Sequence, residues 1–144
     1  MSDIAKINER FNRYVIKLLN IAESSGGIDN CTSLLIKQSL KDLNKINPLL
    51  VMSLMGKYLM ENNDLIKSSN EQFLINLTNK QYLKQKINEY NIPHSDSDID
   101  VLNDIVASIY NKWGTYDDEQ KKIIFKLFQI LLSEYSKYLH LTII

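Results

Sequence analysis

The sequence is poor in residues that break or cross-link a chain. Its 144 residues include two prolines, four glycines and one cysteine. The lone Cys31 cannot form an intramolecular disulfide, which favours a reducing compartment. Proline and glycine are the strongest breakers of regular structure, so their scarcity predicts long uninterrupted elements.

A net charge of either sign is also absent. Lysine and arginine together number 17, as do aspartate and glutamate. Net charge therefore gives no long-range attraction to nucleic acid or an anionic membrane, although a local basic patch stays an alternative. The first residues are charged where a signal peptide needs an apolar core, so we expect a cytosolic or nuclear protein.

Long apolar runs of transmembrane length are missing as well. The most apolar segment, residues 48–61, is interrupted by Ser53, Gly56 and Lys57. A bilayer-spanning helix needs about 20 predominantly apolar residues. The sequence therefore predicts no membrane insertion.

The 44% of hydrophobic residues recur mostly at three- and four-residue spacing. This period is typical of amphipathic helices, and no long run alternates as a half-buried strand does. We therefore predict an all-α protein in which residues 1–144 form a single domain, a compact bundle of about seven helices. Apolar central helices are expected near residues 48–61 and 116–140, packed against each other.

Capping residues predict where the helices begin and end. The first helix is expected over residues 3–24, with Gly26-Gly27 as its stop. Asn30 or Thr32 is the predicted cap of the second, which ends at Asn47-Pro48, and Asn47 is then expected to cap the third. Two further short helices are predicted at the capping-box patterns SNEQ and TNKQ.

The stretch HSDSDID, residues 94–100, brings three alternating aspartates next to a histidine and raises the question of a metal site. An EF-hand loop would also need a glycine and a glutamate where this sequence has Val101 and Ala107. Acidic residues in a first helical turn stabilise the positive end of the helix dipole. We therefore predict a helix start capped by Ser95 or Asp96.

No pattern in the sequence indicates catalysis. Cys31, His94 and His140 stand singly on different segments, without the paired spacing of zinc ligands. A glycine-rich phosphate loop and a nucleophile elbow are both missing. The prediction is a non-enzymatic protein without catalytic residues, metal or cofactor.

One candidate binding feature is a basic stripe. Four cationic residues spaced by four, three and four positions share one side of the first predicted helix, and they include both arginines of the chain. They could contact phosphates or an acidic partner, or form an ordinary solvated flank. The candidate binding residues are Lys6, Arg10, Arg13 and Lys17.

The second candidate is an interface near the C-terminus. Residues 139–144 are largely apolar to the last position, whereas chain ends in water are usually polar and frayed. This segment either folds back into the core or docks on a neighbouring subunit. The candidate interface residues are Trp113, Tyr138, Leu141, Ile143 and Ile144.

Several segments together resemble a known class of proteins. Phe11-Asn12, SLKDLNKINPLL, YLMENNDLIKSSNEQFLINLTNKQYL and KKIIFKLFQILLSEYSKY resemble small all-helical proteins of unknown function encoded by giant DNA viruses. The likeness is one of composition and helix order over about residues 7–138. It implies a viral protein of the host cytoplasm, at the viral factory, or of the virion. Together with the absence of a catalytic pattern, it favours a structural or assembly protein with itself or other virion proteins as partners.

Two alternatives remain open. Asn111-Lys112-Trp113-Gly114 resembles a corner of poxvirus domains similar to apoptosis regulators, although the arginine of that corner is absent and it comes late in the chain. That resemblance implies a groove near Trp113 for an amphipathic partner helix. The other alternative is nucleic-acid binding through the basic stripe, which would weaken steeply with salt.

Overall fold

The computed structural model describes residues 2–26 and 28–142. Within them lie eight α-helices and one short 3₁₀ helix, and no strand. The all-α prediction is confirmed, and the helix it missed is the five-residue α4. In chain order the elements are α1 (Asp3–Ser24), α2 (Asn30–Ile46), α3 (Leu50–Glu61), α4 (Asn63–Lys67), α5 (Gln72–Leu77), α6 (Lys80–Glu89), α7 (Asp96–Tyr110), η1 (Trp113–Thr115) and α8 (Asp118–Thr142).

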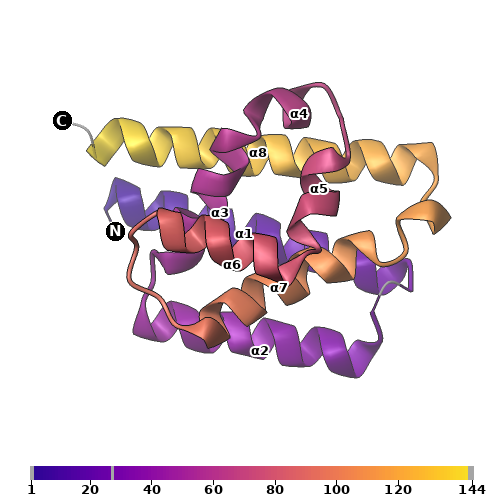
Figure 1. Ribbon diagram of the computed structural model, residues 1–144, viewed down its shortest axis with the longest axis horizontal. Helices are drawn as coiled ribbons and strands as arrows, with labels where there is room; N and C mark the ends of the chain where they lie inside the picture. The colour runs from indigo at the N-terminus through magenta and orange to yellow at the C-terminus, as the bar shows by residue number, and fades with distance from the viewer. Residues whose placement is uncertain (1, 27, 143–144) are drawn as a thin grey trace.

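The longest helices, α1 and α8, pack side by side and run in opposite directions (Figure 1). Every third or fourth residue of α1 is buried, as its sequence period predicts. The buried α1 residues include Phe11, Val15 and Leu18, and those of α8 include Phe128 and Leu131. None of the described helices combines the length and apolar character that a membrane span requires.

Helix α3 lies at the centre of the bundle and packs against α8. It is buried on nearly all sides, from Leu50 to Leu59. The predicted central position of both apolar helices is therefore confirmed. Gly56 of α3 lies against the ring of Tyr135, and a β-carbon at position 56 would overlap that ring.

The predicted ends of several helices need correction. Asp29, rather than Asn30 or Thr32, caps α2, because its carboxylate accepts bonds from the amide (2.7 Å) and hydroxyl (2.9 Å) of Thr32. Asn47 follows the end of α2, and α3 begins after Leu49 with no side-chain cap. The sequence pattern marked the right junctions, but several neighbouring polar residues can cap a helix, and local geometry selects one.

Two other predicted ends are confirmed. Gly26 follows α1 with φ of 80°, a left-handed conformation that glycine adopts without strain. Gly27, the other half of that predicted stop, lies outside the described residues. HSDSDID begins α7 through a capping box, in which the Ser95 hydroxyl accepts from the Asp98 amide (3.3 Å) and the Asp98 carboxylate accepts from the Ser95 amide (2.8 Å).

Candidate functional site

Residues with catalytic or metal-binding chemistry are scattered over the described part of the chain. Residues 2–26 and 28–142 hold no group of three histidine, cysteine, aspartate or glutamate side chains that could bind a metal ion. His94 lies with Nδ1 2.6 Å from the carbonyl oxygen of Ile92 and Nε2 3.0 Å from Oδ1 of Asn88, so both ring nitrogens have local partners. Cys31 is exposed at the start of α2.

The predicted basic stripe is divided by the fold. The Nε of Arg10 donates to both carboxylate oxygens of Glu134 at 3.1 Å, and Nη2 lies 3.1 Å from Oε2. Glu134 is only 5% exposed, so this pair joins α1 to the buried side of α8. Hydrogen bonding to Glu134 raises the pKa of Arg10. Arg10 therefore links α1 to α8, with 36% of its side chain exposed.

The other three residues of the stripe remain at the surface. Lys6, Arg13 and Lys17 are exposed. Arg13 forms a long surface pair with Glu9 (3.7 Å), and the Lys17 ammonium lies 5.0 Å from the ring centre of Tyr14. Of the three, Arg13 lines a groove between α1 and α2 together with residues that the stripe did not include.

The predicted interface residue Trp113 is a core residue. It is 7% exposed, stacked on Tyr110 with ring centres 5.8 Å apart, and in edge contacts with Tyr116 and Phe125. No groove described in the structure is lined by Trp113. Asn111, which belongs to the same corner of the chain, lines a groove between α2 and α7.

The C-terminal candidates are only partly described. Helix α8 continues to Thr142, so the described tail extends the helix and does not turn back. Tyr138 is half-buried against the core, and Leu141 is 36% exposed. Ile143 and Ile144 lie outside the described residues.

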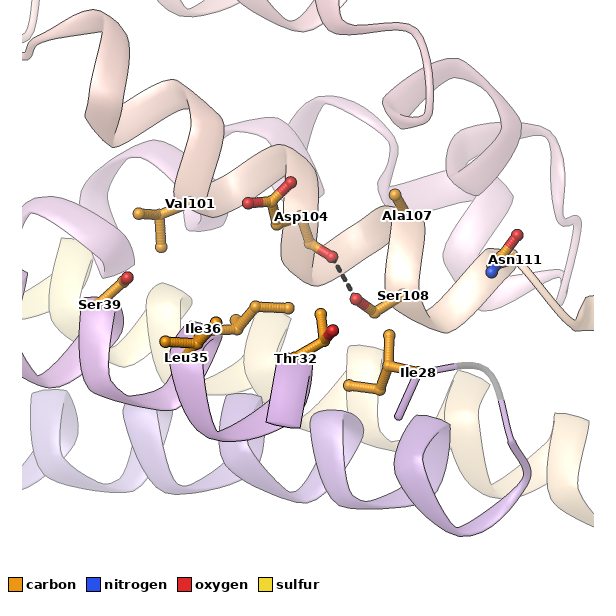
Figure 2. Close-up of a pocket in the computed structure, with 10 residues that line it drawn as sticks. All are labelled: Ile28, Thr32, Leu35, Ile36, Ser39, Val101, Asp104, Ala107, Ser108 and Asn111. Atoms are coloured by element: carbon orange, nitrogen blue, oxygen red, sulfur yellow. Dashed lines mark hydrogen bonds between the residues drawn. The ribbon is translucent and has the colours of Figure 1, made fainter. Parts of the chain in front are cut away.

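The structure reveals a groove between α2 and α7 that the sequence reading did not single out. It has a volume of about 510 Å³ (Figure 2). Leu35 and Ile36 of α2 lie on one side, and Val101 and Ala107 of α7 lie on the other. Each side of the groove thus carries aliphatic side chains together with polar ones, among them Thr32 on α2 and Asp104 on α7.

Three large aliphatic side chains of α2 are exposed. Leu34 is 64%, Leu35 65% and Ile46 85% exposed. Leu35 and Ile46 lie in the same helical segment as Leu40, which is 2% exposed, yet both are in solvent. The run Leu34-Leu35-Ile36 already indicates in the sequence that some aliphatic residues of this helix are exposed, because three consecutive helical residues cannot all point to one core. Ile36 is the buried one of the three.

A second groove, between α1 and α2, is rich in cations. Its volume is about 610 Å³. Lys37, Lys41 and Lys45 line it from α2 at four-residue spacing, and Arg13 lines it from α1. A lysine every fourth residue forms one ridge along a helix, and that spacing was visible in the sequence. Which helix lies opposite the ridge is a property of the fold.

Asparagine side chains hold α1 and α2 at the distance that leaves this groove open. The Asn44 amide donates to Asn12 Oδ1 (3.0 Å), and the Asn12 amide donates to the carbonyl (2.9 Å) and side chain (3.2 Å) of Asn8. The Asn8 amide donates to the carbonyl of Pro48 (2.8 Å). This chain of bonds links α1 to α2 and to the start of α3.

One carboxylate lies at the rim of the α2–α7 groove. Burial raises the pKa of Asp104, and the negative charge of Asp100 raises it further, while Lys80 lowers it. Lys80 pairs with Asp100, so Asp104 is left without an ion pair among the described residues. Its charged form is less stable in the folded protein than in water.

Comparison with known proteins gives this site no precedent. No family model, no curated protein and no solved structure matches the chain.

Proposed function

We propose that this protein is non-enzymatic and acts by contact with other proteins, first of all with copies of itself. The observation that carries the proposal is the exposure of Leu35 (65%) at the edge of a groove of about 510 Å³ that is partly lined by aliphatic side chains. A surface with a protruding aliphatic side chain beside a groove has both parts of a self-complementary contact. Under a two-fold axis, each Leu35 would enter the groove of the other copy.

The neighbouring residues support the same surface. Leu34, adjacent to Leu35 in the chain, is 64% exposed, and Ile46, three helical turns further along α2, is 85% exposed. Single exposed aliphatic residues are ordinary, but contiguous ones beside a groove are typical of protein interfaces. Burying an aliphatic side chain contributes about 1.5–3 kcal/mol, and this gain opposes the loss of translational and rotational freedom on association.

The biological role that we propose is structural or assembly work in a virus, as a minor component of the virion or of the viral factory in host cytoplasm. This part rests on the resemblance to helical proteins of giant DNA viruses. Self-association is the property that such a role requires, and other virion proteins would be further partners.

The test is the mass of the purified protein in solution, measured by light scattering over a concentration series. We expect mass to rise with concentration for the natural chain and to stay at the monomer value for Leu35→Glu and Ile46→Glu. Ile123→Glu is the matched control, because Ile123 is 48% exposed on α8. A monomer at all concentrations, or equal loss of association in the control, would contradict the proposal.

The C-terminal surface is tested separately with a chain lacking residues 139–144. If only that chain fails to associate, the interface lies at the C-terminal end of α8, at Leu141, and not at the α2–α7 groove. Circular dichroism confirms that each variant keeps its helix content.

A further inference from the structure

The α1–α2 groove combines cations with an apolar floor. Lys37, Lys41 and Lys45 form one wall, and Arg13 stands on the other. Between them lie Ile16, which is half-buried, and Leu40, which is 2% exposed. The aliphatic stems of long cationic side chains can extend such a floor while their charges stay in water.

The lysines of this groove differ in the ion pairs that they form within the protein. Lys37 donates to Asn20 Oδ1 (2.5 Å) and lies 3.5 Å from Glu23, so it is held in place. Lys41 and Lys45 have no ion pair among the described residues. Two neighbouring like charges without counter-charges repel each other, and an anionic partner would relieve that repulsion.

On the opposite wall, the ion pair between Arg13 and Glu9 is weak enough for a partner carboxylate to replace Glu9. Arg13 and Glu9 have side chains 59% and 58% exposed and approach only to 3.7 Å. Surface pairs of this kind contribute about 0–1 kcal/mol. A partner carboxylate can therefore replace Glu9 at Arg13 with little loss.

We infer that the α1–α2 groove binds an acidic amphipathic helix of a partner protein, with its carboxylates on Lys41, Lys45 and Arg13 and its aliphatic side chains over Ile16 and Leu40. The charge pattern supports this occupant. Residues four apart on a helix are about 6 Å apart along its axis, so glutamates spaced by four match the repeat of the lysine ridge. The apolar floor between the charged walls suits the aliphatic face of such a helix.

This site is distinct from the surface proposed for self-association. It lies between α1 and α2, whereas Leu35 and Ser39 face α7 on the other side of α2 (Figure 2). A protein could therefore use both surfaces, one for copies of itself and one for an acidic partner.

The experiment uses the full chain and a fluorescent synthetic helical peptide of about 15 residues, with glutamates at every fourth position beside a row of leucines. Binding is followed by fluorescence anisotropy at low and high salt. We expect saturable binding that weakens as salt screens the ion pairs. A peptide with glutamine in place of each glutamate should not bind.

The decisive variants reverse charge in the groove. Lys41→Glu/Lys45→Glu should bind the acidic peptide about tenfold more weakly or worse, because two exposed ion pairs are lost and two repulsions are added. Lys122→Glu/Lys126→Glu makes the same charge change on exposed residues of α8 and should bind like the natural chain. Lys41→Gln/Lys45→Gln, which removes charge without reversing it, should lie between them.

Several results would overturn the inference. They are absence of binding, equal binding by the glutamine peptide, or equal weakening in both lysine pairs. A single-stranded oligonucleotide that binds through Lys41 and Lys45 and displaces the peptide would identify the groove as a nucleic-acid site instead. The Leu35→Glu chain should keep its affinity for the peptide, so failure of self-association and failure of this site are separable.

Discussion

The ring of Tyr135 on α8 lies directly against the backbone of Gly56 on α3. A glycine inside a helix is about 1 kcal/mol less favourable than alanine, and here the missing side chain lets two central helices approach closely. Gly56→Ala should therefore lower the free energy of unfolding by about 1–3 kcal/mol, although it raises helix propensity. Urea unfolding measures the change.

A matched control lies on the same helix. Ser53 is half-buried, and Ser53→Ala should change stability by less than about 0.5 kcal/mol. In a Tyr135→Ala background the space beside residue 56 opens, and Gly56→Ala should then stabilise the protein. Destabilisation of equal size in both backgrounds would show that the ring is not the obstacle.

The pair of Arg10 and Glu134 should matter more than the pair of Arg13 and Glu9. Arg10→Met removes the main partner of a carboxylate that is 5% exposed and leaves only Lys137, at 3.3 Å. A buried charge without its partner is strongly destabilising. The melting temperature should fall clearly for Arg10→Met and hardly at all for Arg13→Met.

A double variant tests the cause of that fall. Arg10→Met/Glu134→Met replaces both charges with apolar side chains of similar length, and it should recover stability that Arg10→Met loses. If the double variant melts below the single one, the loss comes from packing and not from the unpaired carboxylate.

Phe73 should anchor the short helix α5. It is fully buried, its ring centre lies 5.1 Å from that of Phe128, and its carbonyl accepts a bond from the Tyr58 hydroxyl (3.0 Å). Phe73→Ala should cost about 3–5 kcal/mol of unfolding free energy. Ile75→Ala on the same helix, at a residue 36% exposed, is the control and should cost far less. A loss of unfolding free energy for Phe73→Ala as small as that for Ile75→Ala would show that α5 contributes little to the core.

Asp104 should make stability depend on pH. Burial and the charge of Asp100 raise its pKa, so the folded protein binds this proton more tightly than the unfolded chain does. The stability that protonation provides is present below the unfolded pKa, about 3.9, and is lost as pH rises through the higher folded pKa.

Asp104→Asn should therefore raise the melting temperature slightly at neutral pH, because the charge of this surface carboxylate is only partly desolvated and asparagine carries none. The gain should shrink as pH falls through the carboxyl range and vanish in acid. Asp118→Asn, at an exposed position in the first turn of α8, is the control and should show no such gain. A gain for Asp104→Asn that is the same at neutral and acid pH would rule out the ionisation as its cause.

Local signals predicted most helices because periodicity and capping act within a few residues. Ser95 and Asp98 of HSDSDID form the capping box by themselves, and the α1 period needed no tertiary contact. The five-residue α4 was missed because it is shorter than the window over which a helical period can be recognised.

Whether each candidate site residue is paired, buried or exposed depended on the fold. Arg10 is paired because Glu134, 124 positions away, comes to its side when α1 and α8 pack. Trp113 is buried because α8 turns back over η1 and brings Phe125 to it. No spacing within a single helix contains this information.

The sequence by itself determined that the chain is helical, where most helices begin and end, and which residues carry charge. Only the tertiary structure decided which charges are paired and which apolar residues stay exposed. Arg13 joined the lysines of α2 in one groove, and Leu35 was left in solvent beside another. The physical reason is that helix formation depends on near neighbours along the chain, whereas a binding surface depends on which helix faces cover one another.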